Sequence, residues 1–231
     1  MPSVFDGKMR DVVHKEQLFT DEFEPVGGLF YGQCAEYCGN SHAYMSFRAL
    51  AQTDSDFDAW VKRFRDAQNP NKQPTKYNPE EEYEIGSVVT FPDSEIGESA
   101  VREFKAIKKI AKGQAPNIST KSWEKAHSDD YEIGKQLFSS LNCVQCHAIN
   151  RTGLGSKGPN LTLYGIRTSL AAGWMRNDEE NLVKWLKNSN DVKFGNLMWN
   201  GEGVDDEHPL RNLENDDEKV NQLVAYLLGL K

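Results

Sequence analysis

The feature that most constrains this chain of 231 residues is the run Cys143-Val144-Gln145-Cys146-His147. At this spacing two thiols can add to the vinyl groups of one haem, while the imidazole of the next residue reaches the iron. The alternative is half of a zinc site, which needs a second pair of ligands at similar spacing. No such pair lies nearby in the sequence. The run therefore predicts a covalently bound haem c with His147 as its proximal ligand.

The residues on either side of this run extend the prediction to a whole domain. Tyr131-Glu132-Ile133-Gly134 opens a predicted helix that runs to Phe138, and Leu223-Val224-Ala225-Tyr226-Leu227 closes a last one. Between them, Gly158-Pro159-Asn160-Leu161 follows the haem motif. In these stretches residues 128–231 resemble a class I cytochrome c, and the resemblance implies an all-α fold.

The resemblance also implies a methionine as the second axial ligand. In that family the methionine closes a stretch like Val192-Lys193-Phe194-Gly195-Asn196-Leu197-Met198, so Met198 is the expected ligand. Met175 is the alternative, because a methionine can equally be a flexible core residue. A His/Met pair raises the reduction potential of the haem, which suits a carrier at the oxidising end of a chain. The family usually has proline after the methionine, where this chain has Trp199, and the shape of the haem edge is therefore left open.

Two further haem contacts are implied by the same resemblance. The backbone carbonyl of Pro159 is expected to hold the free ring nitrogen of His147. Arg167 is expected to face a haem propionate.

A second set of metal-binding residues lies nearer the start of the chain. Cys34 and Cys38 are four positions apart, His42 follows after four more, and Met45 after three. Soft sulfur ligands together with imidazole select copper. Two cysteines in one tight loop can bridge two metal ions, whereas a blue-copper site uses one cysteine only. A disulfide between the two cysteines is the alternative, since the spacing alone permits it in an oxidising compartment.

Together with the preceding Gly28-Leu29-Phe30-Tyr31-Gly32-Gln33, these ligands resemble the copper A domain of cytochrome c oxidase subunit II over residues 1 to about 66. The resemblance implies a cupredoxin-like β-barrel and a binuclear copper centre, CuA. Its implied ligands are Cys34 and Cys38 as bridges, with His42, Met45 and the backbone carbonyl of Glu36 as terminal groups. The carboxylate of Glu36 is further implied in magnesium binding at the border with subunit I. Nitrous oxide reductases usually carry an aromatic residue there, so Glu36 favours the oxidase.

The resemblance leaves this barrel incomplete. In the family a first histidine ligand, the earlier strands and the membrane helices come before the stretch that here begins at Met1. His14 is more simply a solvated loop residue than a replacement ligand. Unpaired strand edges invite pairing with another chain, so we expect a separate chain or segment to supply the missing strands and histidine. No stretch approaches the ~18 apolar residues that a transmembrane helix needs, and no signal-peptide pattern opens the chain.

The predicted fold is multidomain, an incomplete all-β cupredoxin-like part followed by an all-α class I cytochrome c. Residues 1–68 form the C-terminal part of the copper A domain, and apolar residues at helical spacing predict that a helix from Asp54 to Gln68 closes it. Residues 69–127 are expected to be a linker that opens on a proline-containing break. Within it, charged and small apolar residues alternate as in an amphipathic helix, predicting a helix over 98–112. Residues 128–231 form the cytochrome domain.

Charge and cysteine usage fit this division. The formal net charge is -8, which argues against a nucleic-acid partner because phosphate binding needs a basic patch. The same charge can steer a basic electron donor or simply keep exposed domains soluble. The two motifs use all four cysteines of the chain. Covalent haem attachment leads us to expect the protein on the outer face, periplasmic or extracellular, of a bacterial inner membrane. The oxidase resemblance implies that it lies there within a membrane complex, and we expect no transmembrane helix in this chain.

Taken together, the two resemblances imply subunit II of a caa3-type haem-copper oxidase. Electrons would pass from the haem to the copper pair and on to subunit I, which reduces oxygen. The donor would be a cytochrome c, a bc1-type complex or an alternative complex III. Two other functions stay open, a subunit of a copper A nitric oxide reductase and a cytochrome c carrier or docking module with a degenerate copper domain.

Overall fold

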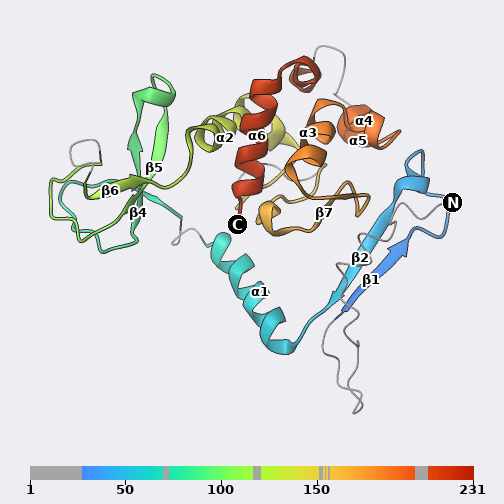
Figure 1. Ribbon diagram of the computed structural model, residues 1–231, viewed down its shortest axis with the longest axis horizontal. Helices are drawn as coiled ribbons and strands as arrows, with labels where there is room; N and C mark the ends of the chain where they lie inside the picture. The colour runs from blue at the N-terminus through green and yellow to red at the C-terminus, as the bar shows by residue number, and fades with distance from the viewer. Residues whose placement is uncertain are drawn as a thin grey trace. The chain divides into compact units, whose positions relative to one another are not determined.

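A computed structural model of the chain describes residues 28–69, 73–116, 121–150, 153, 155, 157–200 and 208–231 (Figure 1). They form two compact units, each built from two separate stretches of sequence. The first unit comprises Met1–Asp66 and Gly165–Asp216, and the second comprises Ala67–Tyr164 and Asp217–Lys231. His14, which we expect to be a solvated loop residue, lies outside the described residues.

The first unit begins with a two-stranded hairpin. Strands β1 (Gly28–Gln33) and β2 (Ser46–Ala51) are antiparallel, with Gln33 opposite Ser46 at one end of the ladder. The loop of residues 34–45, which contains the short 3-10 helix η1 (His42–Tyr44), therefore starts and finishes at the same end of the hairpin. All the predicted copper ligands lie on this loop.

Helix α1 (Asp54–Ala67) follows the hairpin, as predicted. The hydroxyl of Thr53 accepts a hydrogen bond from the backbone N–H of Asp56 at 3.3 Å and caps the first turn. Along one face Trp60 stacks on both Phe57 and Phe64, with ring centroids 5.9 and 5.7 Å away. This face gives the helical spacing that the sequence shows.

The remainder of the first unit comes from the cytochrome half of the chain. Its elements are β7 (Ser169–Leu170), β8 (Met175–Arg176), α3 (Glu179–Lys187), α4 (Ser189–Val192), α5 (Leu197–Asn200) and the 3-10 helix η6 (Pro209–Asn215). Helix α3 packs on η6. Buried leucines lie on both elements, Leu182 on α3 and Leu213 on η6.

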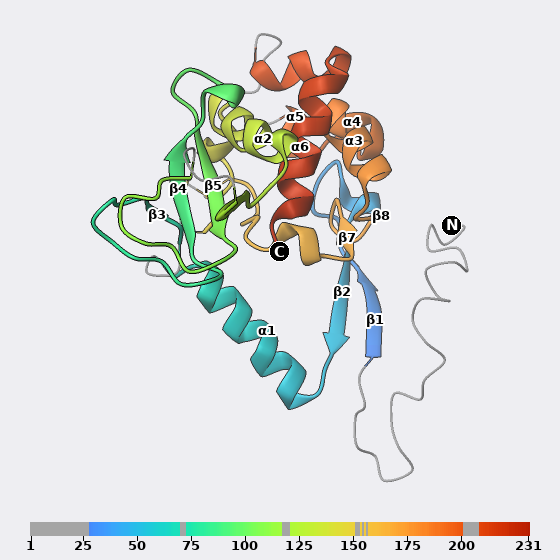
Figure 2. The same ribbon diagram turned by 60° about the vertical axis from the view of Figure 1, so that its left-hand side comes forward.

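The second unit contains a four-stranded sheet where a linker was expected (Figure 2). Its spatial order is β3 (Thr75–Lys76), β4 (Val88–Pro92), β5 (Val101–Ala106) and β6 (Trp123–Lys125). β3 is parallel to β4, and the other pairs are antiparallel. Buried side chains form a core of its own within residues 69–127: Tyr77, Tyr83, Val89, Ala106, Ile110, Ala115 and Trp123. The sheet is thus a folded element, and the linker prediction is wrong.

The predicted helix over 98–112 is also wrong, because its centre is strand β5. Burial along the strand has a period of two, with Arg102 and Ala106 fully buried. An arginine therefore occupies a core-facing position, and Asp93 and Asp129 neutralise its charge. A hydrophobicity pattern hides this strand because its most buried side chain is charged.

The predicted first and last cytochrome helices are confirmed as α2 (Asp129–Ser140) and α6 (Asp217–Gly229), which pack together. They approach closely at Gly134, where a Cβ atom would lie 1.9 Å from the carbonyl oxygen of Gln222. The expected order of β-structure followed by a helical cytochrome part is confirmed. Within the described residues, no helix combines the length and the apolar character needed to cross a membrane.

The second unit also holds two short 3-10 helices before and around the haem motif, η3 (Ser94–Ile96) and η4 (Cys143–Gln145). A third, η5 (Tyr164–Ile166), lies where the second unit passes into the first.

Candidate metal and haem sites

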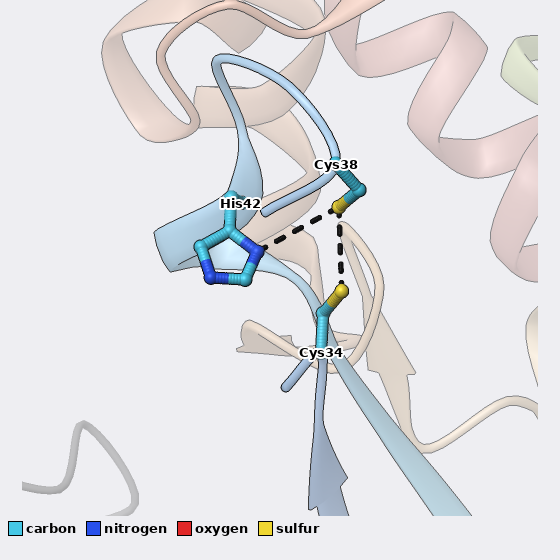
Figure 3. Close-up of side chains that lie close together, drawn as sticks. All are labelled: Cys34, Cys38 and His42. Atoms are coloured by element: carbon cyan, nitrogen blue, oxygen red, sulfur yellow. Dashed lines mark hydrogen bonds between the residues drawn. The ribbon is translucent and has the colours of Figure 1, made fainter. Parts of the chain in front are cut away.

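The structure brings the predicted copper ligands of the β1–β2 loop together (Figure 3). The Sγ atoms of Cys34 and Cys38 lie 3.3 Å apart. Cys38 Sγ is 3.7 Å from His42 Nδ1 and 3.6 Å from Met45 Sδ. Cys34 Sγ is 3.1 Å from the backbone carbonyl oxygen of Glu36. Both thiols are free, and a disulfide would require about 2.0 Å between the sulfurs, so the alternative of a disulfide is not what the structure shows.

Backbone hydrogen bonds explain why the loop adopts this shape. The N–H of Cys34 donates to the carbonyl of Met45 at 3.0 Å and closes the loop at the end of the hairpin. The N–H of His42 donates to the carbonyl of Gly39 at 3.0 Å, and Gly39 has a φ of 131°, which suits glycine. The η1 turn then carries the chain back to Met45, so the first and last ligands meet.

The donor set fits a dinuclear copper site. Sulfur and imidazole donors bind a metal at roughly 2.0–2.3 Å, so two donors on one ion lie up to about 4.5 Å apart. The ligand atoms of Cys34, Cys38 and His42 all lie within 4.8 Å of one another. Two adjacent thiolates can each contact two ions, and soft sulfur with imidazole selects copper. Glu36 offers its carbonyl to this group, while its side chain is exposed.

The two thiols influence one another before any metal binds. The hydrogen bond with Cys34 raises the pKa of the Cys38 thiol above its ordinary value. Burial and the negative charge of the Cys34 thiolate raise it further. A metal ion must therefore displace a proton from this pair as it binds.

The predicted proximal haem ligand is held by a contact that the resemblance implies. The Nδ1–H of His147 donates to the carbonyl oxygen of Pro159 at 2.9 Å. That tautomer leaves Nε2 without a proton and able to bind iron. Gly158 permits the approach, because a Cβ atom there would lie 2.5 Å from His147 Cε1.

The two cysteines of the haem motif lie at the start of η4 and directly after it. The N–H groups of Cys146 and His147 both donate to the carbonyl of Cys143, at 3.2 and 2.9 Å. Burial raises the pKa of Cys143 to about 12.

The expected distal ligand Met198 lies on α5 and is half-buried. Asn196 fixes the turn before it, since its Oδ1 accepts from Ser189 Oγ at 3.0 Å and from the N–H of Trp199 at 3.1 Å. The alternative ligand, Met175, lies on strand β8. Because Met198 belongs to the first unit and His147 to the second, their pairing on one haem stays a prediction.

Two other expectations concern Arg167 and Trp199. The backbone carbonyl of Arg167 accepts from Asn177 Nδ2 at 3.1 Å, and its contact with a propionate stays a prediction. Trp199, which replaces the family proline, is buried beneath the guanidinium of Arg211, whose Cζ lies 4.1 Å from the ring centroid. No sequence pattern indicates this cation–π contact, because Arg211 lies twelve residues further on.

Residues 131–231 match the family model of cytochrome c. The chain is also similar to cytochrome c oxidase subunit 2 of Bacillus sp. (strain PS3), with 30% identity over 220 residues that cover 94% of this chain and 42% of the relative. Subunit 2 of Alkalihalophilus pseudofirmus is 26% identical over 214 residues, covering 93% of this chain and 42% of the relative. Subunit 2 of Bacillus subtilis is 26% identical over 240 residues, covering 100% of this chain and 49% of the relative. The chain thus spans less than half the length of these curated relatives. The chain is thus similar to cytochrome c oxidase subunit 2 over most of its own length, and its residues 131–231 are similar to cytochrome c.

Proposed function

We propose that this chain is the electron-transfer part of subunit II in a caa3-type haem-copper oxidase. It takes electrons on a covalently bound haem c and delivers them through a binuclear copper A centre to an oxygen-reducing subunit I. The observation that carries the proposal is the convergence of Cys34, Cys38, His42, Met45 and the Glu36 carbonyl on one loop. A cytochrome carrier without a copper centre has no need of these ligands.

The residues of this chain bind and orient the two cofactors. Cys143 and Cys146 attach the haem, His147 and Met198 hold its iron, and the Pro159 carbonyl fixes the orientation of the imidazole. Cys34 and Cys38 would hold the copper ions, which would supply a pair of sites able to share one electron. A shared electron changes the charge on each ion little, so the ligands need little movement. No acid, base or nucleophile of this chain takes part.

We also propose partners and a cellular location for this chain. Subunit I accepts the electrons, and the exposed carboxylate of Glu36 takes part in a magnesium site at its border. A chain or segment outside this sequence supplies the remaining cupredoxin strands and the first histidine ligand. The donor is a cytochrome c, a bc1-type complex or an alternative complex III. The whole assembly works on the outer face of a bacterial inner membrane.

Metal analysis and electron spin resonance of the native complex test this proposal. We expect two coppers in this subunit for each c haem, and a signal in which one unpaired electron is shared by two copper nuclei. The variant Cys38→Ser should lose that signal and keep the attached haem. A native complex with haem c and no dinuclear copper would refute the proposal and leave a cytochrome c carrier.

A further inference from the structure

We propose that two parts of this chain form a built-in docking contact, through which one electron passes from the haem to the copper pair. They are the copper loop, residues 34–45, and the segment of residues 193–197 that leads to Met198. The inference rests on the proposed function, and it assigns the transfer to named residues of this chain. No bond forms or breaks in this step and no proton moves. The haem iron is oxidised by one electron and the copper pair is reduced by the same electron.

The contact is centred on Ser41, the neighbour of the copper ligand His42. Its hydroxyl donates a hydrogen bond of 2.8 Å to the backbone carbonyl of Phe194, although the two residues are 153 positions apart. Phe194 precedes Met198 by four residues. A continuous path of covalent bonds and one hydrogen bond therefore joins a copper ligand to the expected haem ligand. Both ends of this path lie in the first unit.

Close backbone approach accompanies this hydrogen bond. Gly195 has a φ of 75°, and a Cβ atom at that position would lie 2.4 Å from the Cβ of Asn40. Only glycine fits both the backbone conformation and the space. The copper loop therefore lies against the chain before Met198, with Asn40 packed on Gly195.

A second set of contacts holds the same loop against the β7–β8 hairpin. The N–H of Ser46 donates to the carbonyl of Ala172 at 3.2 Å. The rings of Tyr44 and Trp174 meet edge to face, with centroids 4.9 Å apart. In both Figure 1 and Figure 2 the loop end of the hairpin lies beside the orange segment that carries these residues.

One more hydrogen bond and one buried charge belong to this contact. Arg48 Nη1 donates to Thr168 Oγ1 at 3.2 Å. Lys193, next to Phe194, is buried in the same segment. Contacts on two sides of the loop, made by residues more than a hundred positions away, define a specific interface rather than a tethered encounter.

The test measures haem-to-copper transfer inside the purified, fully loaded oxidase after flash reduction of the haem. The double variant Ser41→Ala/Trp174→Ala removes one hydrogen bond and one ring contact from the interface. We expect the docked population, and with it the transfer rate, to fall about tenfold. The variant rate should also decrease with solvent viscosity, because the domains must now find each other before transfer. Ser41→Thr, which keeps the hydroxyl, should restore most of the rate.

The matched control is Thr90→Val/Trp60→Ala. Thr90 also donates a hydroxyl hydrogen bond to a backbone carbonyl, that of Thr75 at 3.4 Å, and Trp60 also packs on aromatic rings. Neither takes part in the docking contact, so the control should transfer at the wild-type rate. Haem potential and copper resonance signal should be unchanged in both double variants. Hydrogen exchange of residues 40–48 should be faster in Ser41→Ala/Trp174→Ala only.

The possible outcomes separate the two proposals. If the copper signal is present and the interface variant transfers at the wild-type rate without dependence on viscosity, the docking contact is refuted and the proposed function stands. If the wild-type complex has no dinuclear copper signal, the proposed function fails first, and the docking inference fails with it.

Discussion

At the scale of single residues, the orientation of His147, the proposed proximal haem ligand, is set by its neighbours. The carbonyl of Pro159 accepts from its Nδ1, and Gly158 leaves room for the ring. A hydrogen bond to the far nitrogen of a ligating imidazole fixes its tautomer and makes it a stronger ligand. The residues after the haem motif therefore orient the imidazole that the motif supplies.

Substituting Gly158 tests this directly. In Gly158→Ala the new methyl group would lie 2.5 Å from His147 Cε1, so the ring must move away from the Pro159 carbonyl. We expect a loss of about 1–3 kcal/mol in the free energy of unfolding of the haem-loaded chain, the range typical of overpacking. Thermal unfolding followed by haem absorbance measures it. An unchanged melting temperature would show that the close approach has no energetic role.

The choice of distal ligand can be tested at Met198. A thioether favours ferrous iron, so Met198→Ala should lower the haem reduction potential by on the order of 0.1 V or more. Copper should remain bound, because none of its ligands is altered. Met175→Ala is the matched control and should leave the potential unchanged. A fall in the control and not in Met198→Ala would assign the haem to the other methionine.

At the scale of elements, charged side chains join strand β5 to helix α2. Arg102 is fully buried on β5 and forms ion pairs with Asp93 and, at 2.7 Å, with Asp129 at the start of α2. Burial alone would lower the pKa of the arginine, but the two carboxylates raise it above its ordinary value. The same arginine lowers the pKa of Asp93 against the effect of burial. The sheet and the cytochrome helix are thus held together by charge.

Removing Arg102 should therefore destabilise the second unit strongly. Arg102→Ala leaves the buried carboxylate of Asp93 without its partner, and breaking a buried pair in this way costs about 3–5 kcal/mol. Lys109→Ala is the control, because Lys109 pairs with Glu82 and Glu84 on the exposed surface, where such pairs are worth about 0–1 kcal/mol. Urea unfolding of both variants measures the difference. Equal losses in the free energy of unfolding would show that the buried ion pair contributes no more than an exposed one.

Next to Arg102, Glu103 makes the contact between strand β5 and helix α2 sensitive to acid. Burial raises the pKa of Glu103, but His127 and Lys135 outweigh burial and lower it to about 2. A carboxylate with a lowered pKa contributes stability above its unfolded pKa and loses it as the pH falls through the folded value. The buried Glu132 opposes this trend, since burial raises its pKa and protonation relieves it.

We therefore expect the second unit to lose on the order of 2 kcal/mol from this carboxylate as the pH falls from about 4.5 to 2. Glu103→Gln should be less stable than wild type at pH 7 and show a smaller decrease on acidification. Unfolding curves of both proteins across this pH range check the expectation. If the two curves run parallel, Glu103 is not the group responsible.

At the scale of the whole molecule, the sequence predicted both cofactor motifs and helices α1, α2 and α6, but not the four-stranded sheet between them. Ligand spacing within one short loop depends on local geometry, so Cys34 to Met45 and Cys143 to His147 could be read directly. Strand β5 was missed because its core-facing position holds Arg102, whose partners lie on other elements. His127 pairs with Glu103 at 3.4 Å and stacks on Tyr131, and no sequence pattern indicates either contact.

Contacts between distant segments were beyond the sequence for the same reason. Nothing near Ser41 indicates that its partner is Phe194, because the hydrogen bond depends on the packing of the cytochrome segment against the hairpin. A backbone carbonyl as acceptor also leaves no trace in the side-chain sequence. The contact between the copper loop and the segment before Met198 is visible only in the three-dimensional structure.

Time-resolved absorbance of the loaded oxidase tests the central claim, that electrons pass from the haem of this chain to its copper pair. After rapid reduction of the haem, we expect its reoxidation and the reduction of the copper pair to follow one rate constant with equal numbers of electrons. In Cys38→Ser the haem should be reduced and then stay reduced. Haem that is reoxidised equally fast in Cys38→Ser, with electrons reaching subunit I, would contradict the account.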